Sequence, residues 1–253
     1  MPGPDLTVSV DLMTVGETLA VLGAVLVAST TQVTVGFGFA LLAVPVMSLA
    51  VPTHDAVIIS TILGLLTSSF QAHHGRRDTD RTLVRRLILS SCVGIPMGLL
   101  LFQRVDERVL RGVLGASVLG AVVFLTSRRP VRSSVGLDWV CGVLSGALAS
   151  SLSTNGPPLV FVLQARELPM SVFRPTINTV FTASGVISLI AFIVGGDVDG
   201  DTMIHALLAV PVLIIGSRVG FLLRGRVPES GARRLVLILL ALAGVSALVA
   251  AFA

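Results

Sequence analysis

The sequence has no lysine, no tyrosine, two cysteines and one tryptophan among its 253 residues. All 18 basic residues are therefore arginine, and charged residues of both signs make up only 13% of the chain, about half the share of a typical soluble domain. Hydrophobic residues make up 53% of the sequence, and its mean hydropathy is +0.94. This composition excludes an ordinary soluble domain and predicts an integral membrane protein.

The cysteines and arginines also argue against metal and nucleic-acid sites. Cys92 and Cys141 do not have metal-ligand spacing, so we expect both to pack as buried apolar residues within helices. The arginines lie in short loops between apolar runs, without the basic stripe and interleaved aromatic side chains that nucleic-acid binding needs. We expect no metal, cofactor or nucleic acid. The expected partner at this point is the lipid bilayer, and a homo-oligomer is left open.

Long apolar runs recur along the whole chain. Six of them approach the roughly 20 residues that a membrane-spanning helix needs. They cover residues 57–70, 87–102, 109–125, 176–194, 203–223 and 235–253. Two further apolar regions, 16–51 and 139–165, are interrupted by glycine, proline and small polar residues, as in SLSTNGPPLVFVL at 151–163.

The distribution of arginine discriminates between two ways of threading region 139–165, because cytoplasmic loops are enriched in arginine. If this region crosses the membrane once, eight arginines lie inside and ten outside. If it turns at residues 154–156 and returns to the side from which it came, fifteen lie inside and three outside. The hairpin threading is favoured. With a second hairpin at 16–51, it places both termini on the extracytoplasmic side of the plasma membrane.

This threading predicts an all-α polytopic membrane protein made of two inverted-topology repeats. Each repeat is a broken helical hairpin plus three transmembrane helices, which gives roughly 8 to 10 membrane segments in all. The N-terminal repeat covers residues 1–130 with its hairpin at 16–51, and the C-terminal repeat covers 131–253 with its hairpin at 139–165. GIPMGLLLFQRVDE at 94–107 and GSRVGFLLRGRVPE at 216–229 agree at seven of fourteen positions. Both contain G-x-x-x-G, a spacing that favours close helix packing in lipid.

The helix breaks indicate a binding site, because unpaired backbone groups are tolerated at membrane depth only where protein or a water-filled cavity satisfies them. Asn155 and Gly156 suit a turn, and Pro157 suits the first position of a new helix. Inverted symmetry would bring the two hairpin tips together, so that two helix N-termini point toward one anion. No Asp or Glu falls deep within a predicted span, so a site built from buried carboxylates is not expected.

The candidate substrate-binding residues come from both hairpins and from the helices that follow them. They are Thr31, Gln32, Thr34, Gly36, Gly38, Ser60, Thr61, Thr154, Asn155, Gly156, Pro157, Arg174 and Asn178. Serine and threonine in spans more often bond to their own helix or to a neighbouring helix, so packing is the alternative role for each of them. Arg174 has the alternative role of setting the topology.

Three stretches resemble the sulfite exporter TauE/SafE family of membrane transporters: VGFGFALLAVPVMSL at 35–49, STNGPPLVFVL at 153–163 and FRPTINTVF at 173–181. The resemblance covers almost the whole chain. It implies a secondary transporter of small sulfur-containing anions such as sulfite, sulfonates or sulfoacetate, coupled to the proton gradient. It also implies that Gly36, Gly38, Pro45, Gly156 and Pro157 are the hairpin motif residues.

The chain departs from the family pattern at both motifs. Family members often have a longer glycine run in the first hairpin, where this chain has Phe37 and Phe39 beside its glycines. They often have Gly-Gly-Pro in the second hairpin, where this chain has Asn155 before Gly156. These substitutions bear on the shape of the pocket, and hence on the substrate, more than on the fold.

We therefore expect a transporter that works by alternating access around a midplane site, and not an enzyme. A passive anion channel and a transporter of carboxylates are the alternatives, because the same helix dipoles would serve them. A more distant alternative is an intramembrane enzyme that uses Ser145 or Ser153 with His205, although neither serine lies in a G-x-S-x-G setting.

Overall fold

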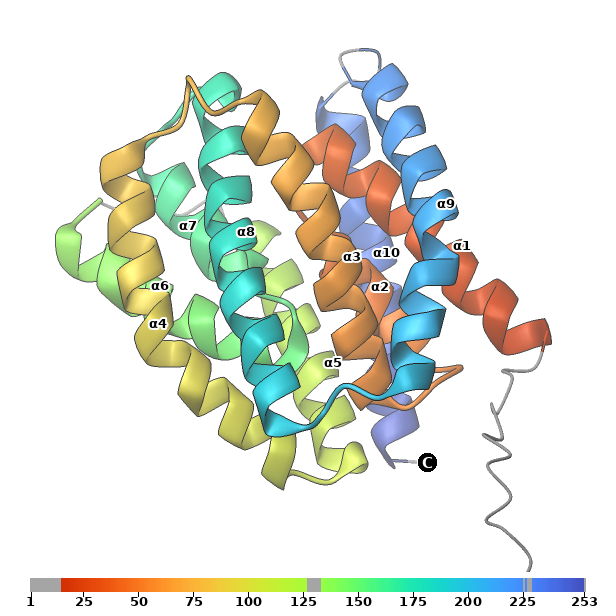
Figure 1. The fold of residues 1–253 in the computed structure, drawn as a ribbon. Helices are drawn as coiled ribbons and strands as arrows, with labels where there is room; N and C mark the ends of the chain where they lie inside the picture. Colours follow the sequence, from red (N-terminus) through yellow and green to blue (C-terminus); the bar gives the residue numbers. More distant parts are fainter. Residues whose placement is uncertain (1–14, 127–132, 225, 227–228, 253) are drawn as a thin grey trace, which may run out of the picture.

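The structure, a computed structural model, describes residues 15–126, 133–224, 226 and 229–252. Within these residues it is entirely helical, which confirms the predicted class (Figure 1). The helices are α1 (Val15–Val35), α2 (Phe39–Met47), α3 (Thr53–His74), α4 (Arg81–Arg104), α5 (Glu107–Thr126), α6 (Val135–Leu152), α7 (Gly156–Ala165), α8 (Met170–Gly195), α9 (Gly200–Leu223) and α10 (Glu229–Phe252). The expected repeat boundary at 130/131 lies outside the described residues.

Among the residues that the structure describes, six helices are long and apolar enough to cross a membrane. They are α1 from Gly16, α3, α4, α6, α8 and α9, with 18 to 26 residues each. The short helices α2 and α7, with 9 and 10 residues, extend about 14–15 Å at 1.5 Å per residue, half of the hydrocarbon thickness. The chain is therefore a multi-pass membrane protein whose two interrupted regions each contain one long helix and one half-length helix.

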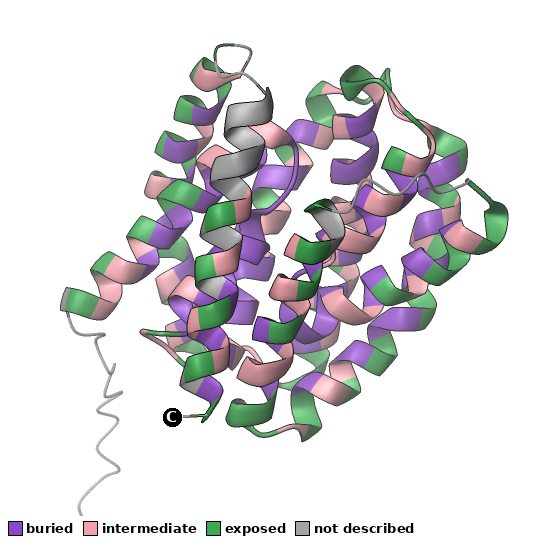
Figure 2. Ribbon diagram, turned by 180° about the vertical axis from the view of Figure 1, so that it is seen from behind, coloured by how far each residue is buried: buried purple, intermediate pink, exposed green. Residues whose placement is uncertain are grey.

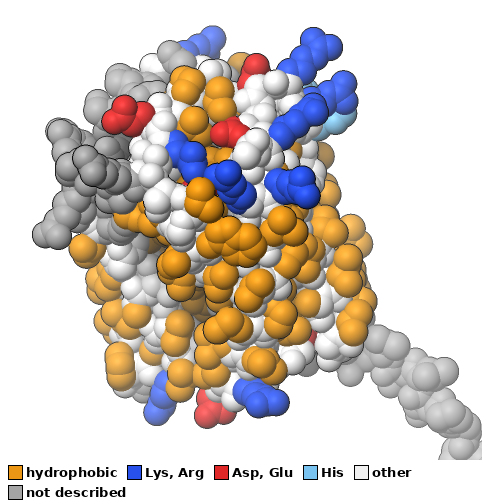
Figure 3. Space-filling model, turned by 90° about the vertical axis from the view of Figure 1, so that its left-hand side faces the viewer, with side chains coloured by type: hydrophobic (Ala, Val, Ile, Leu, Met, Phe, Trp, Pro, Cys, Tyr) orange, Lys and Arg blue, Asp and Glu red, His pale blue; other side chains and the backbone are white. Residues whose placement is uncertain are grey.

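The outer surface is apolar in the way that lipid contact requires. Leu89, Val93, Met97 and Leu100 of α4 are each at least half exposed and follow one face of the helix. Figure 2 shows exposed residues on the outward sides of the helices and buried residues between them. Figure 3 shows a broad apolar band on one side of the molecule, with arginines gathered at its upper end. A patch of this size is rare on soluble monomers, so we assign this band to the bilayer.

Among the described helices, α4, α6 and α9 begin at a polar N-cap, whereas α3 and α8 follow a proline and have no side-chain cap. Asp80 accepts a hydrogen bond from the Leu83 amide at the start of α4, and Ser134 accepts one from Leu137 at the start of α6. Asp199 caps α9 by accepting from the Thr202 amide at 2.6 Å. These side chains satisfy amides that have no partner within the helix. The half-length helices α2 and α7 have no such side-chain cap.

The principal helix contacts join the two parts of the chain. α4 packs along α6, α1 along α9, α3 against α8 and α5 against α10. The two G-x-x-x-G stretches lie in these contacts, which confirms their predicted role. An added Cβ at Gly94 or Gly98 would collide with the backbone of α6, and one at Gly216 or Gly220 would collide with α1.

The expectation for the cysteines is half wrong. Cys141 is buried, as predicted, but Cys92 is exposed. Cys92 lies beside Val93 on the outward face of α4, opposite Gly94, which faces α6. A membrane helix exposes apolar side chains to lipid, so an apolar segment alone does not identify which cysteine is buried.

We expect Gly94→Ala to destabilise the protein, because its methyl group would collide with the Val143 carbonyl oxygen of α6. Overpacking of this kind costs roughly 1–3 kcal/mol. Gly120→Ala is the matched control, since nothing lies within 4 Å of an added Cβ at Gly120. Thermal unfolding of the two variants in detergent checks the prediction. An unfolding temperature for Gly94→Ala equal to that of Gly120→Ala would contradict it.

Candidate functional site

The first helix break lies between α1 and α2 and depends on two glycines. Gly36 and Gly38 have φ values of 109° and 106°, a region that side chains with a Cβ rarely adopt. Gly36 also lies directly against α8, because an added Cβ would be 2.9 Å from Arg174 Cγ. The chain then reverses into α2, whose first residue is Phe39. Residues 36–38 therefore form a compact tip that presents the N-terminus of α2.

Asn178 of α8 is the hub that holds this first tip. Its amide nitrogen donates to the Gly36 carbonyl at 3.0 Å and to the Arg174 carbonyl at 2.8 Å. Its amide oxygen accepts from Gln32 and Gln71, both at 3.3 Å. Asn178 is completely buried. All of its hydrogen-bonding capacity is thus used to join the tip to α1, α3 and α8.

Arg174 lies beside the same tip, near the end of α9. Its guanidinium donates to the Thr34 carbonyl at 3.0 Å, which satisfies one of the last carbonyls of α1. Burial and the charge of Arg174 lower the pKa of Arg224, which directly follows α9. Two arginines therefore lie close together next to the first tip.

The second helix break lies between α6 and α7. The sequence places its turn at residues 154–156, but the left-handed residue is Ser153, with a φ of 57°. Asn155 is instead the residue before α7, and the helix begins at Gly156, so Pro157 is its second residue. The backbone carbonyl of Asn155 accepts a hydrogen bond from Ser145 at 3.1 Å, and the side-chain amide nitrogen of Asn155 donates one to Ser184 at 3.0 Å. The second tip is therefore held by α6 and α8.

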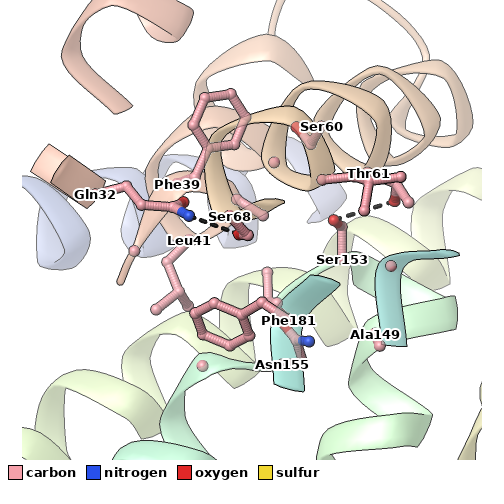
Figure 4. Close-up of a pocket in the computed structure, with 17 residues that line it drawn as sticks. Gln32, Phe39, Leu41, Ser60, Thr61, Ser68, Ala149, Ser153, Asn155 and Phe181 are labelled. Atoms are coloured by element: carbon pink, nitrogen blue, oxygen red, sulfur yellow. Dashed lines mark hydrogen bonds between the residues drawn. The ribbon is translucent and has the colours of Figure 1, made fainter. Parts of the chain in front are cut away.

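The two tips meet and enclose a small cavity. An added Cβ at Gly156 would be 3.6 Å from both Leu41 and Phe37, so the start of α7 touches the first tip. The cavity between them has a volume of about 50 Å³. A single water molecule needs roughly 10–15 Å³, so the cavity fits a group the size of a small oxyanion. Figure 4 shows α3 closing one side with Ser60, Thr61 and Ser68.

Hydroxyl and amide groups provide the polarity of the cavity. Gln32 donates to Ser68 at 2.8 Å, and Thr61 donates to Ser153 at 3.1 Å (Figure 4). The hydroxyls of Ser60 and Thr154 are buried without a hydrogen-bond partner among the described residues. A buried hydroxyl without a partner is costly, and both of these hydroxyls belong to residues that line the cavity.

The candidate residues fall into two groups. Those that line the cavity are Gln32, Gly38, Ser60, Thr61, Thr154, Asn155 and Gly156. Those that do not line it are Thr31, Thr34, Gly36, Pro157, Arg174 and Asn178. Gly36, Arg174 and Asn178 support the first tip from behind. Thr34 donates to the carbonyls of Thr30 and Gly220, the packing role that was the alternative for a threonine in a span.

Two residues that line the cavity, Ser153 and Phe181, were not among the candidates. Ser68 of α3 also lines the cavity, two turns after Thr61 on the same helix face. Asp138 is completely buried and accepts from Arg166 at 2.6 Å, which ties the start of α6 to the end of α7. The sequence gives no signal for this contact, because Asp138 borders an apolar run.

The serines of the enzyme alternative have other partners. Ser145 donates to the Asn155 carbonyl, and Ser153 accepts from Thr61. Within the described part of the chain, no hydrogen bond joins either serine to His205. The same residues contain no cluster of His, Cys, Asp and Glu that would hold a metal ion.

Comparison with known proteins gives a consistent result. The probable sulfite/organosulfonate exporter TauE of Cupriavidus necator is 26% identical over 199 residues, 75% of this chain and 77% of that protein. The probable inner membrane transporter protein TsaS of Comamonas testosteroni is 27% identical over 158 residues, 61% of this chain and 66% of that protein. No solved structure matches. The family model for sulfite exporter TauE/SafE matches residues 21–247, and the chain therefore belongs to this family of membrane transporters.

Proposed function

We propose that the protein is a secondary transporter that exports small sulfur-containing anions, with the cavity between the two tips as its substrate site. The observation that carries this proposal is the meeting of two helix N-termini without side-chain caps, those of α2 and α7, at a small cavity with several polar side chains in its lining. Free amides and the positive ends of helix dipoles bind anions. The names of the two relatives, an organosulfonate exporter and a membrane transporter, support the substrate class.

The proposed mechanism is alternating access between two inverted repeats. In this scheme α1 to α5 of the first repeat correspond, in order, to α6 to α10 of the second. The contact of α1 with α9 then has its counterpart in the contact of α6 with α4, while the α3–α8 and α5–α10 contacts each join two corresponding helices. All four contacts are present. This pairing supports the duplication. Rocking of the two halves about the tips would open the cavity to each side in turn.

The proposed orientation has both termini outside. In Figure 1 the α3–α4 connection and the C-terminal end of α9 lie at one end of the bundle, and the α4–α5 and α8–α9 connections lie at the other. The first end has Arg76, Arg77 and Arg224, which supports assigning it to the cytoplasm. The other end has the arginine-free α8–α9 connection with Asp197 and Asp199.

Transport is tested with purified protein in liposomes. We expect saturable uptake of labelled sulfite or a sulfonate, faster under an imposed pH gradient, with counterflow when unlabelled substrate is present on the other side. Counterflow separates a carrier from a channel, because only a carrier exchanges bound substrate between two access states. Liposomes without protein provide the control. Uptake without saturation or counterflow would favour the channel, and no uptake of any sulfur anion would refute the substrate class.

Gly156→Leu is expected to reduce transport by at least about tenfold while leaving the protein inserted and folded. The new side chain would occupy the cavity between Leu41, Phe37 and Phe181, the atoms of which lie 3.6–3.8 Å from an added Cβ. Gly120→Leu is the control on an exposed helix face. Uptake in liposomes and thermal unfolding are measured on the same preparations. Full transport by folded Gly156→Leu would remove this cavity as the substrate site.

Orientation is tested by labelling single cysteines in a variant with Cys92 and Cys141 replaced by serine. We expect Gly200→Cys to react with a membrane-impermeant maleimide in intact cells and Arg77→Cys to react only after permeabilisation. Both positions are exposed in the structure, so access depends on the side of the membrane. The reverse labelling pattern would invert the proposed topology.

A further inference from the structure

The cavity contains no charged side chain among its described lining residues. Its polar groups are Gln32, Ser60, Thr61, Ser68, Ser153, Thr154 and Asn155, and the others are apolar residues or glycines. Arg174, the arginine beside the first tip, donates to the Thr34 carbonyl and does not line the cavity. Within the cavity lining, therefore, only helix dipoles and neutral donors can balance the charge of a bound anion.

The two helix N-termini provide a limited positive charge. Each helix dipole is equivalent to roughly +0.5 of an elementary charge at its N-terminus, so two of them balance about one negative charge. α7 supplies few amide donors, because Pro157 and Pro158 in its first turn have no N–H. The hydroxyls of Ser60 and Thr154, both without a partner, are available as further donors. A second negative charge at membrane depth would remain unbalanced, which is strongly unfavourable.

We propose that the cavity selects anions of a single charge, and that sulfite crosses the membrane as hydrogen sulfite. The inference rests on the proposed function and narrows its substrate class. An organosulfonate with one SO₃⁻ group and hydrogen sulfite each carry a single negative charge and several acceptor oxygens. Sulfate, the sulfite dianion and sulfoacetate, with its additional carboxylate, fall outside the class. Each hydrogen sulfite carries one proton with it, so sulfite flux depends on pH without a titratable side chain in the cavity.

The test compares substrates in liposomes at symmetric pH, one unit below and one unit above neutral. Methanesulfonate keeps one charge throughout, whereas sulfite loses its last proton near neutral pH. At a subsaturating total concentration, we expect sulfite uptake to fall roughly five- to tenfold across this range, following the hydrogen sulfite fraction. Methanesulfonate uptake should change by less than about twofold, which controls for effects of pH on the protein. Sulfate and sulfoacetate uptake should stay near the level of protein-free liposomes.

The outcomes separate this inference from the proposed function. Sulfite uptake that stays constant or rises with pH, or sulfate uptake equal to that of methanesulfonate, would overturn the single-charge inference and leave the transporter intact. No uptake of either sulfite or methanesulfonate by folded protein would overturn the proposed function and the inference with it.

A pair of variants tests the neutral donors directly. Ser60→Ala removes a cavity hydroxyl, and Ser188→Ala removes a hydroxyl that is equally buried and without a partner but does not line the cavity. We expect the KM for methanesulfonate to rise roughly tenfold in Ser60→Ala, since a hydrogen bond to a charged group is lost. Ser188→Ala should keep the parent KM. Equal KM values for Ser60→Ala and the parent would show that the Ser60 hydroxyl does not bind the anion. That result would overturn the proposal that neutral hydroxyl donors in the cavity balance the charge of the anion.

Discussion

The hydrogen bonds of Asn178 are the interaction on which the first tip, and with it the cavity between the two tips, depends. A helix break at membrane depth leaves backbone carbonyls and amides without partners, and lipid offers none. Asn178 donates to the Gly36 carbonyl inside the first break and accepts from glutamines of α1 and α3. One buried side chain thus stabilises the break and fixes its position relative to three helices. The second break is held by Ser145 and Ser184 in a similar way.

Because neighbouring helices hold the breaks, the two tips can leave their own helix N-termini uncapped. Asp80 and Asp199 cap α4 and α9, whereas no side chain caps α2, α3, α7 or α8. The starts of α2 and α7 face a cavity of about 50 Å³ whose described lining residues carry no charged side chain. The lining therefore offers neutral hydrogen-bond donors, and Arg174 lies behind the first tip, where it donates to the Thr34 carbonyl.

Small residues control how the rest of the bundle surrounds the site. Gly94 and Gly98 bring α4 against α6, and Gly216 and Gly220 bring α9 against α1. In each contact, the long helix of a hairpin rests on a span from the other part of the chain. Close backbone packing of this kind depends on van der Waals contact rather than on interlocking side chains.

The sequence by itself determined the membrane class, the two helix breaks, the close-packing glycines and the family. Each of these follows from local composition or spacing, because hydropathy, glycine and proline act on the segment that contains them. Only the tertiary structure decided which polar residues reach the cavity. Asn178 and Arg174 are polar residues in an apolar helix, and the sequence made both candidates for substrate binding, with a topology role as the alternative for Arg174. In the fold both side chains donate hydrogen bonds to backbone carbonyls at the first break. Lipid offers these carbonyls no other donor, so the hydrogen bonds hold the two side chains at the break. Ser68 and Ser153 complete the cavity instead, since their positions depend on how α3 meets the second tip.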